Sequence, residues 1–175
     1  RGGGESKARR TYMMKLAGEI LTGEPMEHYS NGYMERGKEM EAEARDLYAF
    51  MHDVDPEQCG FITNGPKGCS PDCLIGANGM AEVKTKTAHL QLEVLLRGEI
   101  PPEHKAQTQG QLWVAEREFV DFVSYWPKLP LFVHRSYRDE AYIKTISDAV
   151  DRFNDELAAL VEQIRAMEPR QLEAA

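Results

Sequence analysis

Three acidic residues and one lysine have the types and spacing that metal-dependent phosphodiester cleavage needs. Asp72 follows a proline, Glu82 and Lys84 come ten and twelve residues later, and Glu41 lies upstream. Clustered carboxylates repel one another unless a cation lies between them, and hard oxygen ligands favour Mg²⁺ or Mn²⁺. The four residues therefore indicate a candidate nuclease site.

A β-hairpin is predicted to bring the downstream members of this set together. Polar and apolar residues indicate strands at 72–76 and 80–84, separated by turn-forming Ala-Asn-Gly at 77–79. Residues two apart in a strand share a face, so Glu82 and Lys84 point the same way.

The length of the turn decides where Asp72 points. A three-residue loop pairs Leu74 with Glu82 and Asp72 with Lys84, which places all the acids and the lysine on one face. A two-residue loop sends Asp72 to the opposite face. Shared chemistry requires the longer loop or a bulge. Spacing alone leaves open a solvated hairpin whose acids and lysine only decorate its surface.

Glu41 belongs to a predicted helix at 32–53. On a helical wheel it falls between Tyr48 and Met34, on the apolar side. A carboxylate on a buried face is costly unless it finds a partner such as a cation. Glu41 is therefore a candidate ligand, whereas the other acids of this helix lie on its solvated side.

Length and composition bound the class of protein. The 175 residues predict a single domain over 1–175, with a basic Gly-rich arm at 1–10, a core at 11–168 and a frayed tail at 169–175. No apolar run is long enough for a membrane span and no signal-peptide pattern opens the chain, so we expect a cytoplasmic protein without a membrane partner.

The charge and the cysteines narrow the chemistry further. A net charge of −8 argues against a generic nucleic-acid coat, but it permits a nuclease whose basic groups are local. Arg9 and Arg10 in the basic arm are candidate DNA contacts, although a mobile tail without a role is the plainer interpretation. The three cysteines contain no CxxC pair, which favours reduced, packed thiols over an iron–sulfur cluster.

Apolar periodicity gives the remaining elements. The last helix has a heptad rhythm that fits either a coiled-coil seam or a long helix packed on its own sheet. Gln107 and Gln111, one turn apart, could reach a phosphate or an attacking water, or could decorate a surface helix. The predicted helices are 11–22, 32–53, 87–96, 104–115 and 139–167, and the predicted strands are 59–63, 72–76, 80–84, 118–126 and 131–137.

This order of elements, with the acids and lysine at these places, resembles the PD-(D/E)XK nuclease superfamily, and within it the lambda-type phage alkaline exonucleases. The resemblance covers most of the chain from residue 11 onward. Residues 36–45 are similar to the family's GK-x-x-E helix, 69–72 to its C-S-P-D, 82–84 to its E-x-K strand and 106–113 to its A-Q-x-Q…W helix. Four ordered matches are far more specific than D…ExK alone.

The resemblance implies an α/β fold with a central mixed sheet flanked by helices, and a processive Mg²⁺-dependent 5′→3′ exonuclease on double-stranded DNA, with Mn²⁺ able to substitute. It also implies a homotrimeric ring that feeds a single-strand annealing protein in phage recombination, in a bacterial host cell. Asp72, Glu82 and the carbonyl of Val83 would bind metal, Glu41 would complete the second metal's shell, and Lys84 would orient or deprotonate the attacking water.

The resemblance extends to residues on the path of the DNA. Gln107 would assist beside the water, and Met34 occupies the place of an apolar wedge that separates the strands. The other candidate DNA contacts are Arg36, Arg45, Arg9 and Arg10.

One departure and two alternatives remain open. The family has an Arg and a Ser upstream of the first matched helix that hold the 5′-phosphate; that segment either lies before Arg1 or 5′-phosphate recognition differs. The chain could also be another PD-(D/E)XK enzyme, such as an endonuclease or a RecB-like repair nuclease. A non-catalytic DNA-end-binding module is the alternative outside enzymes, and the intact acids and lysine argue against it.

Overall fold

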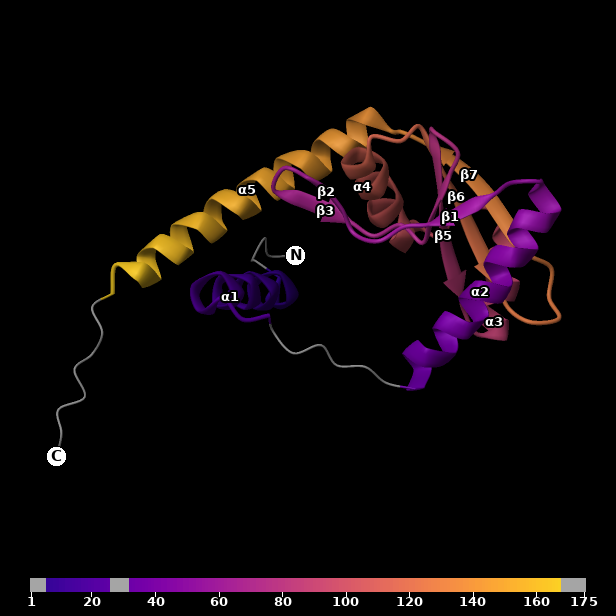
Figure 1. Ribbon diagram of the computed structural model, residues 1–175, viewed down its shortest axis with the longest axis horizontal. Helices are drawn as coiled ribbons and strands as arrows, with labels where there is room; N and C mark the ends of the chain where they lie inside the picture. The colour runs from indigo at the N-terminus through magenta and orange to yellow at the C-terminus, as the bar shows by residue number, and fades with distance from the viewer. Residues whose placement is uncertain (1–5, 26–31, 168–175) are drawn as a thin grey trace. The chain divides into compact units, whose positions relative to one another are not determined.

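The computed structural model describes residues 6–25 and 32–167, apart from the side chains of residues 32–36, 38 and 39. It contains two compact units (Figure 1). The larger unit, Ser30–Ile146, holds the sheet and every acid and lysine of the predicted site. The smaller unit combines Arg1–Tyr29 with Ser147–Ala175. No described helix has the length and apolar character needed to cross a membrane.

A five-stranded mixed sheet forms the centre of the larger unit. Its strands are ordered β1-β4-β5-β6-β7, with β5 and β6 parallel and every other neighbouring pair antiparallel. A separate two-stranded ribbon, β2-β3, precedes β4 in the chain. This mixed sheet flanked by helices confirms the predicted fold class. The strands are β1 Pro56–Gln58, β2 Ile62–Asn64, β3 Lys67–Cys69, β4 Cys73–Ile75, β5 Gly79–Thr85, β6 Phe119–Tyr125 and β7 Phe132–Tyr137.

Helices cover both faces of the sheet because alternate residues of β5 and β6 are apolar in both directions. On one face, α2 (Gly32–His52) packs Ala44 and Tyr48 against Ala81, Val83 and their neighbours (Figure 1). On the other, α4 (Lys105–Ala115), which follows the short turn η1 (Pro102–His104), and α3 (Ala88–Arg97) cover the sheet. The apolar residues of that second face include Met80, Leu112, Val120, Val94, Phe122 and Phe132.

The smaller unit is a helix pair within one chain. Met13 and Ala17 of α1 (Lys7–Thr22) pack against Leu157 and Val161 in the second half of α5 (Glu140–Arg165). The apolar stripe of this half of α5 therefore packs on another helix of its own chain. The sequence left open a coiled-coil seam or a helix packed on its own sheet, and the described apolar contacts of this half are of the helix-on-helix kind.

The predicted basic arm is wrong over residues 7–10. Helix α1 begins at Lys7, four residues before the predicted start, because the side chain of Ser6 caps it by accepting a hydrogen bond from the Arg9 backbone N–H at 3.1 Å. Arg9 and Arg10 are therefore helical residues.

The hairpin between β4 and β5 has the predicted parity but a different register. Leu74 pairs with Met80 and Cys73 with Ala81, so the three-residue loop is 76–78 and the predicted pairing of Leu74 with Glu82 is wrong by two residues. Gly79 belongs to the strand because its bare Cα accommodates the Phe119 ring; a Cβ there would meet the ring at 2.2 Å. A shift of two residues leaves every side chain on its predicted face.

The predicted strand at 59–63 is also wrong in its bounds. The chain instead ends β1 at Gln58 and begins β2 at Ile62, and the two strands join different sheets. Gly65 and Pro66 form the tip of the β2-β3 ribbon, where Gly65 has a φ of +60° that favours glycine.

Candidate active site

The β4-β5 hairpin presents two carboxylates and a lysine on the face covered by α4. Asp72 lies immediately before β4, and its Oδ2 accepts a hydrogen bond from the Val83 backbone N–H at 2.6 Å. That bond fixes the carboxylate to the strand that carries Glu82 and Lys84. The sequence achieves this placement by strand alternation on β5 and by the tight turn that leads from Pro71 into β4.

Glu82 is buried, with 1% of its surface exposed, and three side chains donate to its carboxylate. Lys84 Nζ and Gln107 Nε2 donate to Oε1, the latter at 2.6 Å. Gln111 Nε2 donates to Oε2 at 2.6 Å. Two turns of α4 thus hold the Glu82 carboxylate in one orientation.

The acids around the hairpin outnumber the single lysine that lies among them. The pKa of Asp72 is raised to about 6, mainly by burial and then by the neighbouring Glu82 and Glu41, while the Val83 hydrogen bond and Lys84 act in the opposite direction. A carboxyl group that resists ionisation beside other acids is a common feature of cation-binding and catalytic sites.

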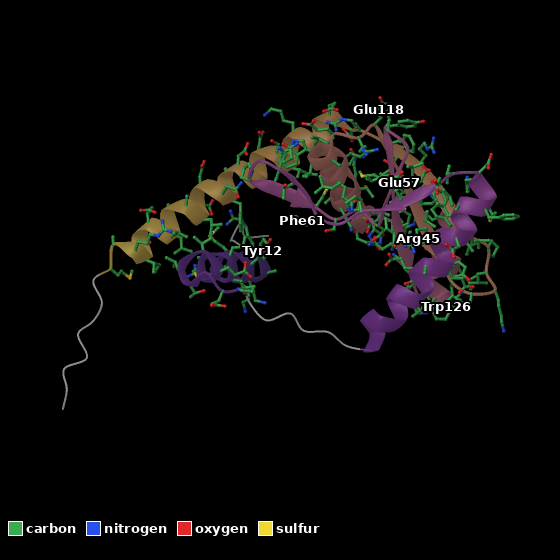
Figure 2. All side chains as sticks on the ribbon, viewed as in Figure 1. Tyr12, Arg45, Glu57, Phe61, Glu118 and Trp126 are labelled. Carbon is green, nitrogen blue, oxygen red and sulfur yellow. The ribbon has the colours of Figure 1, made fainter. Side chains whose placement is uncertain are left out.

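Glu41 approaches the same region from α2. It is half-buried, and its Oε1 lies 3.8 Å from Arg45 Nη1, one helical turn away. Arg45, labelled on α2 in Figure 2, is 15% exposed. The helical wheel therefore placed Glu41 correctly on a partly buried side of the helix. From there its negative charge raises the pKa of Asp72.

The donor set suits a divalent cation, although the described residues contain no group of three His, Cys, Asp or Glu side chains that could hold one. Asp72 and Glu82 supply hard oxygen ligands, as Mg²⁺ prefers. Beside them the side-chain oxygen of Gln111 is buried without a hydrogen-bond partner in the described part of the chain. An unpaired acceptor on a side chain that binds Glu82 is consistent with a site that is completed by a cation and its water.

Gln111 is the residue that sequence reasoning undervalued. Gln107 and Gln111 were both candidates for reaching a phosphate or a water, yet in this structure both amides donate to Glu82. Gln111 also donates to the Ser70 carbonyl at 3.4 Å, two residues before Asp72. The sequence showed two glutamines one turn apart on a helix, but it did not show which acid they would meet.

Among the proposed DNA-contacting residues, Arg45 lies beside Glu41 on α2. The side chains of Met34 and Arg36, on α2, lie outside those described. Arg9 and Arg10 lie on α1 in the smaller unit, where Arg9 Nη1 pairs with Glu156 Oε2 at 2.8 Å.

The three cysteines form no disulfide in the structure. Burial raises the pKa of all three, which keeps them protonated. Cys59 donates through Sγ to the Pro71 carbonyl at 3.3 Å and so supports the turn that carries Asp72. Their role in the site is structural.

Comparisons with known proteins agree with this geometry. Residues 2–118 match the YqaJ-like viral recombinase domain. The structure of an alkaline exonuclease (LHK-Exo) from Laribacter hongkongensis is 32% identical, with a TM-score of 0.82 over 93% of this chain and 86% of that one. A structure of LHK-Exo in complex with dAMP is 33% identical, with a TM-score of 0.84 over 92% of this chain and 85% of that one.

A phage-related exonuclease from Haemophilus somnus 129PT is 16% identical, with a TM-score of 0.65 over 93% of this chain and 91% of that one, and it shares the fold. No curated protein matches the chain significantly. The family match spans more than half of the sequence and ends just before β6, while the structural likeness extends over nearly all of it. The chain therefore belongs to the YqaJ-like viral recombinase family, and it is an enzyme of the alkaline exonuclease type.

Proposed function

We propose that this enzyme degrades one strand of linear double-stranded DNA in the 5′→3′ direction with Mg²⁺, for which Mn²⁺ can substitute. The observation that carries the proposal is the pair of carboxylates, Asp72 and Glu82, fixed side by side on the β4-β5 hairpin next to Lys84. Two acids held so close that the pKa of one is raised, with a lysine beside them, fit hydrolysis of a phosphodiester.

Each side chain has a distinct role in this proposal. Asp72, Glu82 and the Val83 carbonyl bind the cation, and Glu41 completes the shell of a second one. Bound divalent cations activate water and neutralise charge on the scissile phosphate. Lys84 orients or deprotonates the attacking water and stabilises the negative charge that develops on the phosphate.

Gln107 has a positioning role in the same scheme. Its Nε2 donates to Glu82 Oε1, the oxygen that Lys84 also contacts, so it helps keep that lysine and carboxylate aligned beside the water. Met34 on α2 is proposed as the apolar wedge that separates the strands. Arg36, Arg45, Arg9 and Arg10 are proposed phosphate contacts.

The direction and substrate can be tested on a linear duplex labelled at either the 5′ or the 3′ end. Mononucleotide release from the 5′ label first, with Mg²⁺ and not with EDTA, supports the proposal. Release from the 3′ label first would reverse the polarity. Cutting of a closed circular duplex would identify an endonuclease or a RecB-like activity. Duplex-end binding without hydrolysis would identify a non-catalytic module.

A ring-shaped homotrimer is proposed because the chain is acidic. With a net charge of −8, a monomer has little electrostatic hold on DNA between cuts, whereas a closed ring retains the duplex by topology. Light scattering of the DNA-free protein should give three times 19.8 kDa. A monomer that remains processive on long duplexes would contradict the ring and leave the nuclease proposal intact.

The match to a viral recombinase domain supports a proposal for the biological setting. We propose that the enzyme is phage- or prophage-encoded and acts in the cytoplasm of a bacterial host, where its single-stranded product passes to an annealing protein. Co-purification with an annealing protein encoded beside it, and faster annealing of the product when both are present, would support this partnership. Unchanged annealing kinetics would argue against it.

A further inference from the structure

Gln111 occupies an unusual position for a helical glutamine. It lies on α4 with 4% of its surface exposed, and its Nε2 donates both to Glu82 Oε2 at 2.6 Å and to the Ser70 carbonyl at 3.4 Å. One amide group thus links the helix, the central strand β5 and the segment that leads into Asp72. Loss of this link would leave Glu82 Oε2 without its donor, so that only Oε1 would still be held, by Lys84 and Gln107.

The other end of the same amide is unsatisfied. Gln111 Oε1 is buried and has no hydrogen-bond partner among the described residues. Buried polar atoms are almost always paired, so an exception on the side chain that holds Glu82 calls for an explanation. A leucine would fill this place on the helix without leaving an orphaned acceptor, as the adjacent Leu112 does on the apolar face.

Gln109, on the same helix, shows what a purely structural glutamine looks like. It is 2% exposed, its Nε2 donates to the Tyr137 carbonyl at 2.9 Å, and its Oε1 accepts from the Asp139 backbone N–H at 2.8 Å. Both ends of this amide are satisfied by backbone groups, and neither faces an acid. The contrast with Gln111 lies in the partners, because the residue type, helix and burial are the same.

We propose that Gln111 is a positioning residue for the metal-dependent reaction. Its amide nitrogen sets the orientation of the Glu82 carboxylate before the cation arrives, and its free oxygen accepts a hydrogen bond from a water molecule held beside the carboxylates. This inference rests on the proposed function. It differs from the role of Gln107, which is exposed and shares Oε1 of Glu82 with Lys84.

The test compares Gln111→Leu with Gln109→Leu. Mn²⁺ binding to the DNA-free protein is measured by titration calorimetry, and hydrolysis of a labelled linear duplex is measured against Mg²⁺ concentration. Groups that orient metal ligands typically change metal affinity about 10–100-fold when removed. Gln111→Leu should therefore weaken Mn²⁺ binding about tenfold or more and raise the half-saturating Mg²⁺ concentration. Its melting temperature should also fall, because Glu82 Oε2 and the Ser70 carbonyl lose this donor, so metal binding is measured on the folded protein.

The matched variant should lose stability without losing metal affinity. Gln109→Leu leaves the Asp139 N–H and the Tyr137 carbonyl unpaired, so it should lower the melting temperature while the Mn²⁺ affinity of the folded protein stays within about twofold of the wild type. If Gln111→Leu does not fold, Gln111→Met, which retains the unbranched shape without hydrogen-bonding groups, is measured in the same way.

Two outcomes separate this inference from the proposed function. Unchanged Mn²⁺ affinity and unchanged Mg²⁺ dependence in folded Gln111→Leu or Gln111→Met would overturn the positioning role, even if the wild type is an active exonuclease. A wild type that binds Mn²⁺ but does not hydrolyse DNA, with binding weakened by Gln111→Leu, would overturn the proposed function and support the role of Gln111 at the site.

Discussion

Two carboxylates lie buried on neighbouring central strands, and their surroundings differ. Glu82 in β5 is 1% exposed and Asp121 in β6 is 2% exposed. Asp121 pairs in register with Ala81, so it points to the α2 side of the sheet while Glu82 points to the α4 side. Burial alone does not distinguish them.

The partners of Asp121 neutralise it completely. Arg135 donates to both carboxylate oxygens, through Nε and Nη2 at 2.8 Å each, and Tyr48 donates its hydroxyl to Oδ2 at 2.6 Å. The guanidinium also lies 3.7 Å from the centre of the Phe119 ring. Burial and the neighbouring Asp121 raise the pKa of Tyr48 above its ordinary range, so its hydroxyl remains a donor. This is a closed structural network.

The partners of Glu82 leave charge uncompensated. Two of the three side chains that donate to Glu82 are neutral amides. The third donor, Lys84, also offsets the negative charge of Asp72, and Glu41 adds a third acid nearby. A buried carboxylate with a bidentate arginine is a structural element, whereas a buried carboxylate held by amides among other acids retains the capacity to bind a cation. The hydrogen-bond partners, and not the degree of burial, therefore distinguish the structural Asp121 from the candidate metal ligand Glu82.

The strongest test of this comparison removes each acid of the site. Asp72→Ala or Glu82→Ala should lower Mg²⁺-dependent hydrolysis by at least about 10³-fold, because each removes a ligand of the cation that stabilises the transition state. Duplex binding should persist, since docking depends on phosphate contacts elsewhere. End-labelled duplex digestion and gel-shift titration measure the two properties. Retained cleavage in either variant would remove the hairpin from the active site.

The corresponding change in the closed network should act on stability. Asp121→Ala leaves Arg135 and the Tyr48 hydroxyl without their partner, and it should lower the free energy of unfolding by about 2–4 kcal/mol; the exposure of Arg135, 43%, keeps the loss below that of a fully buried pair. Urea denaturation measures it. Turnover of the folded variant should stay within about twofold of the wild type. A selective loss of turnover with unchanged stability would break the comparison.

The residues on the functional face could be predicted from the sequence because strand alternation is robust. The true register of β4 and β5 differs from the predicted one by two residues, yet Asp72, Glu82 and Lys84 still share a face. A register shift of two preserves parity, and a shift of one would have reversed it. The register itself depended on Phe119, 40 residues after Gly79, whose ring fits against the glycine.

Partners from distant elements could not be predicted in the same way. Gln111 meets Glu82 across 29 residues of sequence, and Tyr48 meets Asp121 across 73. No periodicity within one element encodes such pairs, because they depend on how α2 and α4 are placed on the sheet. The early start of α1 was hidden for a local reason: Ser6 caps the helix within a stretch whose glycines and basic residues suggested an arm.

A Lys84 variant tests whether the ammonium group beside Glu82 takes part in catalysis or only balances the charge of the carboxylate. Lys84→Ala should lower turnover by roughly 10²-fold, as the loss of a preorganised charge does, while Mn²⁺ affinity stays nearly intact because both acids remain. Single-turnover kinetics at saturating Mg²⁺ and calorimetric titration separate the two effects. A large loss of metal affinity with normal turnover at saturating metal would make Lys84 a counterpart of Arg135, and the contrast between the two acids would weaken.

The smallest expected effect is the change with pH in the free energy of unfolding that the raised pKa of Asp72 causes. The pKa of Asp72 is raised from 3.8 to about 6, so between these pH values the native protein binds more protons than the unfolded chain, and stability falls as pH rises through this window. For a partly exposed group the loss of stability should be about 1 kcal/mol.

Urea denaturation of the metal-free protein at pH 4 and pH 7 measures this loss. The urea midpoint should fall between the two pH values in the wild type, and it should fall less in Asp72→Asn, which cannot ionise there. Adding Mg²⁺ at pH 7 should stabilise the wild type only. Parallel pH curves for the two proteins would mean that Asp72 is as well compensated as Asp121.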